Sequence, residues 1–247
     1  MGCTHKQSQD GFTLVEISIV MIIIGLLIGG TFGGMKLIEN MQVNKTVQDL
    51  KAIESAALTF KDTYGRLPGD MPNTAARLPS CTDAPCATSG NGDKVLDPFR
   101  NSGVMTSTSE GFTFWHHLAA ADLLSVRVEP TTSLNFGEGQ PSASLEGGYR
   151  IAGGFNSSFS DPTAKPFEGT ALFNGNEATA APTYLNMQII SCLSIENIDR
   201  KMDDSRAYDG WVIGWNCAST LPGGQGDKMA PYRPTWRGAI VYDLKGF

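Results

Sequence analysis

Positive charge is scarce in this sequence. Its 247 residues include 19 Lys and Arg against 25 Asp and Glu, which gives a net charge of −6 at pH 7 with neutral histidines. Protein surfaces that bind nucleic acid carry clustered basic residues. The charge balance therefore predicts no nucleic-acid partner.

The sequence also lacks the local motifs of common enzymes. It contains no Gly-x-Ser-x-Gly nucleophile elbow. The segment GGQGDK at 223–228 does not have the spacing of a phosphate-binding P-loop. No Cys-His or Ser-His-Asp set is locally marked, although a catalytic triad can be dispersed along a chain. We therefore expect a non-enzymatic protein with no catalytic residues.

Long apolar runs are missing except at one place near the N-terminus. No charged residue occurs among the 19 residues from Ile17 to Met35. At about 1.5 Å per residue, a helix of this length crosses the hydrocarbon core of a bilayer. A secretory signal peptide is the alternative, but it has a shorter apolar centre and a more basic start, whereas only Lys6 precedes this run. We predict a single membrane span.

The span has two features that a plain membrane anchor does not need. Glu16 lies at its start, and an ionisable group at membrane depth is costly unless it is paired. Gly25, Gly29 and Gly33 recur every four residues, the spacing that lets membrane helices approach closely. Routine packing in a dimer would also explain the glycines, and we predict that they serve helix packing.

A second apolar pattern follows the span, at the spacing of an amphipathic helix. Charged residues such as Asp49 lie mostly off this stripe, and Gly65 and Pro68 end the helix. We predict one helix from Phe12 to Thr63 whose second half packs on a globular body. The residues of the stripe are Leu37, Met41, Val47, Leu50, Ile53, Ala57, Phe60 and Tyr64.

The sequence GFTLVE at 11–16, with the apolar run after it, closely resembles the N-terminus of type IV pilins and type II secretion pseudopilins. In that family a prepilin peptidase removes a leader that ends in Gly, and the new N-terminal Phe is methylated. The resemblance implies cleavage between Gly11 and Phe12 and makes Glu16 the fifth mature residue. It also implies that Glu16 pairs with the methylated amine of Phe12 in a neighbouring subunit.

The resemblance also implies the organisation of the chain and its partners. It gives a leader at 1–11, a transmembrane and polymerisation half-helix at 12–36, an amphipathic half-helix at 37–64 and a periplasmic or extracellular body at 65–247. The implied partners are prepilin peptidase, other pilin or pseudopilin subunits, an inner-membrane assembly platform and the lipid bilayer. The subunit would span the bacterial inner membrane once and then enter a pilus or a pseudopilus.

Two alternatives to a repeating filament subunit stay open. A mature chain of 236 residues (247 minus 11) is large for a simple repeat, which suits a minor or tip subunit. A single-span, membrane-anchored binding protein that never polymerises is the other alternative. An ordinary anchor of that kind has no need of Gly11, Phe12 and Glu16 in this arrangement.

Three patches of the body resemble segments found in one group of bacterial pilin-like proteins: RLPGDMPNT at 66–74, WHHLAAADL at 115–123 and IDRKMDD at 198–204. His116 and His117 are adjacent, so they point about 100° apart on a helix and cannot share a metal in the usual way. We interpret them as surface or packing residues. The acidic side chains of the third patch, Asp199, Asp203 and Asp204, are interpreted as solvated turn carboxylates.

The body has the pattern of a small α+β fold. A short helix is predicted over 111–124, and the strand candidates are bounded by Gly, Pro or Asn. A long helix packed on a small antiparallel sheet with long loops, as in type IV pilins, is the fold that these pieces predict. The strand candidates are Tyr149–Ala152, Thr170–Phe173, Trp211–Asn216 and Ala239–Leu244.

Four cysteines remain in the mature chain, because Cys3 lies in the leader. Structural zinc sites commonly use Cys-x2-Cys pairs, which are absent. Disulfides in an oxidising compartment are therefore favoured. Four cysteines allow three connectivities, of which we prefer Cys81–Cys86 with Cys192–Cys217.

One segment, SGNGDKVLDP, has alternating oxygen-bearing side chains at Asn91, Asp93 and Asp97. This pattern resembles part of a calcium loop, but the first Asp and the twelfth-position Glu of an EF-hand are missing. An Asx-rich turn is the alternative and is favoured. We therefore expect no cofactor, with structural calcium at these residues as the second interpretation.

Overall fold

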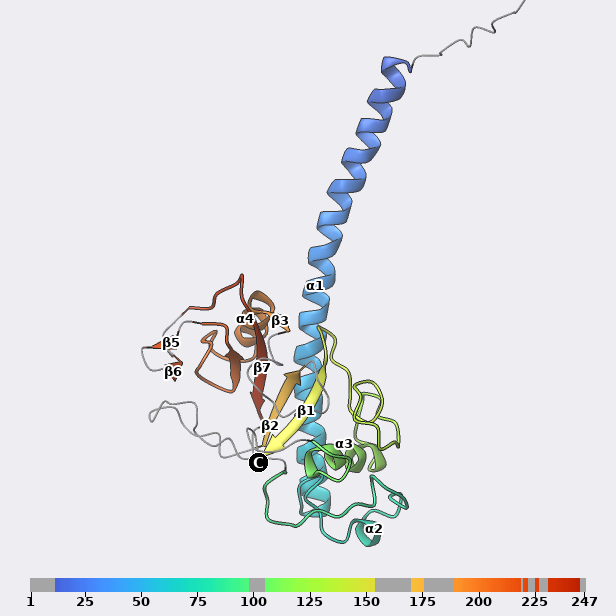
Figure 1. Ribbon diagram of the computed structural model, residues 1–247, viewed down its shortest axis with the longest axis vertical. Coiled ribbons are helices and arrows are strands. Elements are labelled where there is room, and N and C mark those ends of the chain that lie inside the picture. Colours follow the sequence, from blue (N-terminus) through green and yellow to red (C-terminus); the bar gives the residue numbers. More distant parts are fainter. Residues whose placement is uncertain are drawn as a thin grey trace, which may run out of the picture. The chain divides into compact units, whose positions relative to one another are not determined.

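The computed structural model describes residues 12–97, 105–153, 170–175, 189–218, 220–221, 225–226 and 231–244. The chain divides into two compact units, of which the first ends at Met41 and the second begins at Gln42. The α1 helix, Leu14–Tyr64, contributes to both units (Figure 1). It runs through the paired glycines of the span without interruption.

Local chemistry explains both ends of α1. It begins two residues after the predicted start, because Thr13 caps the first turn. At the other end Gly65 adopts φ 68°, and its amide donates to the Lys61 carbonyl at 2.8 Å. A glycine in the left-handed region is the common way to terminate a helix. The helix therefore ends at Tyr64, one residue later than predicted.

In the first unit, the large apolar side chains of α1 are exposed to the surroundings of the chain. Among them, Leu37 and Met41 keep 62% and 61% of their surface accessible. Both belong to the apolar stripe of the sequence but lie outside its buried part. The buried face begins at Val43, because only from there do side chains of the body cover the helix.

In the second unit, one face of α1 forms part of the core. Leu50, Ile53 and Phe60 are fully or almost fully buried among residues of the sheet and of the shorter helices. Asp49 is also buried, contrary to the sequence pattern. Its carboxylate forms an ion pair with Lys45 at 2.5 Å and accepts a hydrogen bond from Ser144 at 3.4 Å. These partners satisfy the buried charge.

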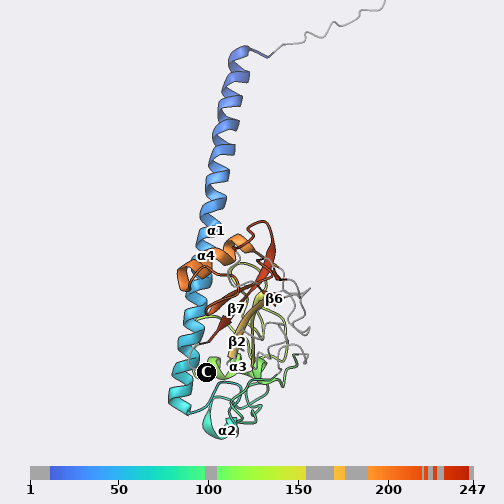
Figure 2. The same cartoon turned by 90° about the vertical axis from the view of Figure 1, so that its left-hand side faces the viewer.

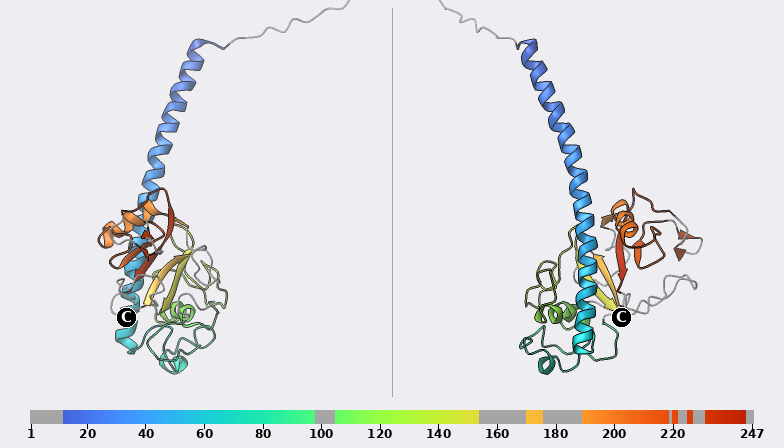
Figure 3. Two further views of the ribbon diagram at one scale, coloured as in Figure 1. Left: turned by 60° about the vertical axis from the view of Figure 1, so that its left-hand side comes forward. Right: turned by 180° about the vertical axis from the view of Figure 1, so that it is seen from behind.

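The sheet of the second unit is antiparallel and is centred on β7, Arg237–Asp243. Its order is β1–β2–β7–β3, and β4 also pairs with β7. Figures 2 and 3 show β2 and β7 beside the part of α1 that belongs to this unit. The other strands of the sheet are β1 (Gly148–Gly153), β2 (Thr170–Gly175), β3 (Ile190–Ser191) and β4 (Val212–Trp215).

All four predicted strands are present, as β1, β2, β4 and β7, and the expected α+β fold is confirmed. The sequence reading missed β3 and a separate hairpin of two short strands, β5 (Thr220–Leu221) and β6 (Gln225–Gly226). Strands of two residues are too short to show an alternating pattern.

Three shorter helices complete the described part of the body: α2 (Thr74–Arg77), α3 (Glu110–Ala120) and α4 (Cys192–Met202). The helix predicted over 111–124 is α3, which ends at Ala120 because Asp122 takes a positive φ of 57°. The α4 helix was not predicted. Its signal is the cap at Ser191, whose side chain accepts a hydrogen bond from the Ser194 amide at 3.1 Å.

Candidate functional site

Thr13 and Glu16 form a reciprocal cap at the start of α1. The backbone amide and the hydroxyl of Thr13 both donate to Glu16 Oε2, at 2.8 and 2.9 Å. The Glu16 amide donates back to the Thr13 hydroxyl at 3.3 Å. This is the capping-box arrangement, in which two backbone amides of the first turn find partners. A carboxylate at this position also suits the positive end of the helix dipole.

The side chains around this cap are exposed, since Phe12 keeps 85% and Leu14 90% of their surface accessible. A soluble helix would hide such residues against the rest of the chain. By length and composition, α1 can cross a membrane. None of the residues that the structure describes covers the apolar surface of residues 12–41, which is therefore open to lipid or to neighbouring helices.

The glycines of the span are not required by contacts within the chain. Apart from the adjoining backbone of its own helix, a Cβ atom placed on Gly25, Gly29 or Gly33 would have no described atom within 4 Å. Each glycine destabilises a helix by about 1 kcal/mol relative to alanine. The surface that these glycines leave open is thus available for a partner helix, and their predicted use in helix packing stays a prediction.

Comparison with protein families adds a decisive observation about this segment. Residues 6–32 match the model of the prokaryotic N-terminal methylation motif. The chain carries a prepilin N-terminus. This motif is the one found in type IV pilins and pseudopilins, and together with one N-terminal apolar helix it fits a single-pass, membrane-anchored pilin-like protein. No curated protein and no solved structure matches the chain.

Within the prepilin motif, the structure describes two of the three predicted key residues. Phe12 precedes the cap and is exposed, and Glu16 lies in the first turn of α1. Gly11, the predicted cleavage position, lies outside the described residues. Sequence reasoning did not foresee the Thr13–Glu16 cap, although the Thr-x-x-Glu spacing could have indicated it.

Two disulfides tie loops of the body. Cys81 pairs with Cys86, and Cys192 pairs with Cys217, with Cα–Cα distances of 5.1 and 5.3 Å. This is the connectivity that the sequence analysis preferred. The second disulfide joins the first residue of α4 to the turn after β4. Both bridges fit an oxidising compartment.

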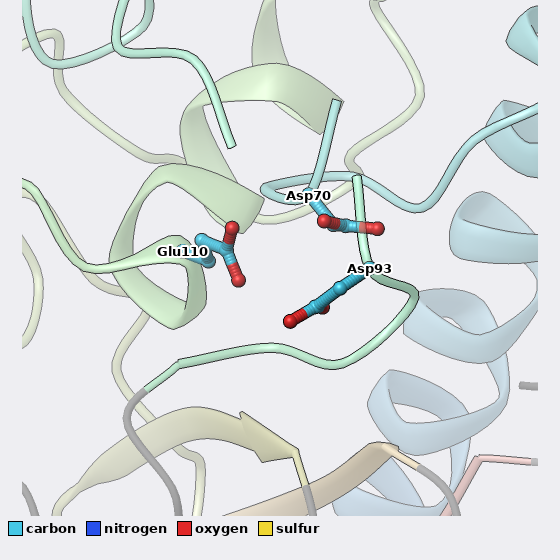
Figure 4. A group of neighbouring side chains, drawn as sticks. All are labelled: Asp70, Asp93 and Glu110. Carbon is cyan, nitrogen blue, oxygen red and sulfur yellow. The ribbon is translucent and has the colours of Figure 1, made fainter. Parts of the chain in front are cut away.

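Asp70, Asp93 and Glu110 form an acidic cluster in the body. One oxygen of each lies within 4.8 Å of the others, and their carboxylates point toward one another (Figure 4). Asp70 and Glu110 are buried, whereas Asp93 is exposed. Burial raises the pKa of both Asp70 and Glu110 above the usual range of carboxyl groups. Carboxylate oxygens are the ligands that calcium prefers.

The backbone of the 91–97 segment already satisfies the two buried carboxylates. Asp70 accepts from the amides of Gly92 and Lys94, at 2.6 and 2.9 Å. Glu110 accepts from the amides of Asn91 and Asp97, at 2.8 and 3.1 Å. These four hydrogen bonds give the cluster a structural role, because they hold the 91–97 loop in place.

The predicted calcium residues are only partly brought together. Asp93 belongs to the acidic cluster, and Asn91 donates to its carboxylate at 2.9 Å. The side chain of Asp97 is not a member of the cluster. Only its backbone amide contacts the cluster, as a donor to Glu110. Sequence reasoning missed Asp70 and Glu110, which are far from this segment along the chain. Calcium at Asn91, Asp93 and Asp97 stays a prediction.

His117 links two loops of the body. Its Nδ1 accepts from the Gly69 amide at 2.8 Å, so its Nε2 carries the proton that is donated to the Cys86 carbonyl at 3.1 Å. Burial lowers the pKa of His117 to about 4, and that of the neighbouring His116 also to about 4. Among the described residues, neither histidine belongs to a group that could hold a metal. Both are packing residues, as the sequence indicated.

Proposed function

We propose that this chain is a structural subunit of a type IV pilus or of a type II secretion-type pseudopilus. A prepilin peptidase cleaves it between Gly11 and Phe12 and methylates the new N-terminus. Residues 12–36 hold the subunit in the inner membrane, with the body in the periplasm. An assembly platform then moves it into a helical filament with other pilin or pseudopilin subunits.

One observation carries the proposal: the methylation motif coincides with a helix whose apolar surface, before Val43, is covered by none of the residues that the structure describes. Lipid covers such a surface before assembly, and neighbouring helices cover it afterwards. Glu16 is poised at the start of this helix, one turn from Phe12. In the assembled state, the methylated amine of a neighbouring Phe12 supplies the positive charge that compensates the Glu16 carboxylate among apolar helices.

Intact-mass analysis of the membrane-extracted protein tests the proposal. We expect a mass that lacks residues 1–11 and carries one added methyl group. Cells without prepilin peptidase provide the control and should yield the uncut chain. A full-length, unmethylated N-terminus in peptidase-containing cells would contradict the proposal and support a membrane-anchored binding protein instead.

A minor or tip subunit is the second candidate, and the length of the mature chain favours it. Peptide identification in purified filaments separates it from a repeating subunit. A major subunit should dominate the filament mass, whereas a minor or tip subunit should be present at a small fraction of it.

A further inference from the structure

Asp199, near the end of α4, is a buried carboxylate with one oxygen left over. Its side chain is fully buried, and Oδ2 accepts a hydrogen bond from the Tyr232 hydroxyl at 2.9 Å. Its Oδ1 has no hydrogen-bond partner among the residues that the structure describes. The sequence-based expectation of a solvated turn carboxylate was therefore wrong for Asp199. A buried polar atom without a partner is costly and calls for an explanation.

Two further carboxylates adjoin Asp199. Ligand oxygens of Asp199, Asp203 and Asp204 all lie within 4.8 Å of one another. Asp203 directly follows α4, and its Oδ2 accepts from the amides of Trp211 and Val212, the latter at 3.2 Å. Asp204 Oδ1 accepts from the Arg206 amide at 2.9 Å. The cluster thus joins the end of α4 to the start of β4.

Negative charge is concentrated at this place. The C-terminus of a helix carries partial negative charge, which disfavours carboxylates and favours cations. The two basic residues of the last turn are engaged elsewhere: Arg200 pairs with Glu196 at 2.6 Å, and Lys201 donates to Asn44. Neither of these contacts places a cation on the carboxylates of Asp199 and its neighbours.

The cluster of Asp70, Asp93 and Glu110 provides a useful contrast. There, all four buried oxygens of Asp70 and Glu110 accept backbone amides. At Asp199, by contrast, Oδ1 accepts no hydrogen bond from the described residues. The two clusters therefore differ in the property that matters for binding an ion.

We propose that Asp199, Asp203 and Asp204 form a binding site for a hard divalent cation, with calcium as its ion. Calcium takes about six to eight oxygen ligands and accepts carboxylates, backbone carbonyls and water. Three carboxylates provide the charged part of such a shell, and the free oxygen of Asp199 anchors it. The bound ion would fasten the end of α4 to the loop that leads into β4. This site does not depend on the filament role proposed above.

The test uses the full chain in detergent, stripped of metal with a chelator and then titrated with CaCl2. We expect calcium to raise the thermal midpoint, because an ion that binds only the folded state stabilises it. Asp204→Asn should abolish this rise. Asparagine keeps an oxygen for the Arg206 amide, so the turn is preserved while the charge is lost. Circular dichroism checks that the variant is folded.

Asp209→Asn is the matched control, since Asp209 lies in the same loop but outside the cluster. This variant should keep the calcium response of the wild type. Terbium luminescence, sensitised by the nearby Tyr232, gives a second readout of binding. We expect affinity for terbium to fall on the order of tenfold or more in Asp204→Asn, because ligand charge sets the affinity of such sites.

Two results would overturn the proposal. One is a wild-type chain whose thermal midpoint and terbium luminescence do not respond to added ion. The other is a calcium response that survives Asp204→Asn but disappears in Asp93→Asn, which would place the ion in the cluster of Figure 4 instead.

Discussion

Residues 14–41 and 42–64 belong to one helix, but their apolar side chains differ in burial. From Val43 onward, α1 hides its apolar face in the core of its own chain, with Leu50 and Phe60 fully buried. Before Met41, every large apolar side chain that the structure describes is exposed. The first arrangement is complete within one molecule. The second leaves apolar surface open, as expected of a helix that can cross a membrane.

The glycines of the two regions show the same difference. In the span, a Cβ on Gly29 would meet no described atom within 4 Å apart from the adjoining backbone of its own helix. In the body, a Cβ on Gly111 would lie 2.2 Å from the Ile151 carbonyl oxygen. Gly111 is thus needed for packing within the chain, whereas Gly29 is available for contacts beyond it. A residue type has no single meaning along this sequence.

The largest expected effect comes from a substitution in the exposed half of α1 that leaves the buried half unchanged. Replacing Glu16 by Leu should abolish filament assembly while leaving leader cleavage and the fold of the body intact. The change removes the charge that a neighbouring amine would pair with. Electron microscopy of sheared filaments measures assembly, and intact mass measures cleavage.

Glu16→Gln separates the ion pair from the helix cap. Glutamine keeps an acceptor for the two Thr13 donors but carries no charge. If the ion pair is the essential contact, Glu16→Gln should form no filaments, just as Glu16→Leu forms none. Normal filaments from Glu16→Gln would show that the cap, and not the charge, is what assembly requires.

A matched pair of truncations on α1 sharpens the comparison by stability. Phe60→Ala should destabilise the body by about 3–5 kcal/mol, the usual cost of deleting a buried aromatic ring. Leu27→Ala should change the stability of the body by less than about 0.5 kcal/mol, because Leu27 contributes nothing to that core. Urea unfolding in detergent, followed by tryptophan fluorescence, measures both. Similar losses in the two variants would mean that the halves are not energetically separate.

Acid should act on the body through His117, which stacks on Phe60 of the buried half with ring centroids 6.2 Å apart. Its pKa is lowered from 6.5 to about 4 in the folded protein. The unfolded chain therefore binds more protons between these values, and stability falls as the pH decreases from 6.5 to about 4. A difference of this size corresponds to roughly 3 kcal/mol.

Comparison with His117→Gln isolates this contribution. Asp199 and Asp243, whose pKa values burial raises to about 7 and about 6, act with the opposite sign over an overlapping range of pH. The stability advantage of the wild type over His117→Gln should therefore shrink as the pH falls from 7 to 4. A constant difference across this range would contradict a neutral, buried His117.

Much of the fold was predictable because its signals are local. The span, the amphipathic repeat and the four longer strands all repeat a pattern within one segment of sequence. The first buried residue of α1, Val43, was not predictable, because the apolar repeat continues from Leu37 and Met41 and only the reach of the body decides where burial begins. The α4 helix was missed because its segment was read as an acidic turn motif.

The prepilin motif of the candidate site was predictable for the same reason, since it is contiguous in the sequence. The acidic clusters were not. Asp70 and Glu110 are brought to Asp93 by the path of the loops, which no local pattern encodes. Asp199 accepts a hydrogen bond from Tyr232, a residue on a distant segment. Contacts of this kind become visible only once the body has folded.

The placement of the two disulfides has a mechanical consequence. Both bridges join cysteines of the body, and none of the four cysteines lies in α1. Tension applied at Phe12 is therefore carried into the body by the non-covalent face around Leu50 and Phe60 and by the single chain connection after Tyr64. The bridges reinforce the loops against stretching, whereas the second half of α1 is held in the body by packing, by hydrogen bonds such as that from Tyr242 to Glu54 and by the chain connection after Tyr64.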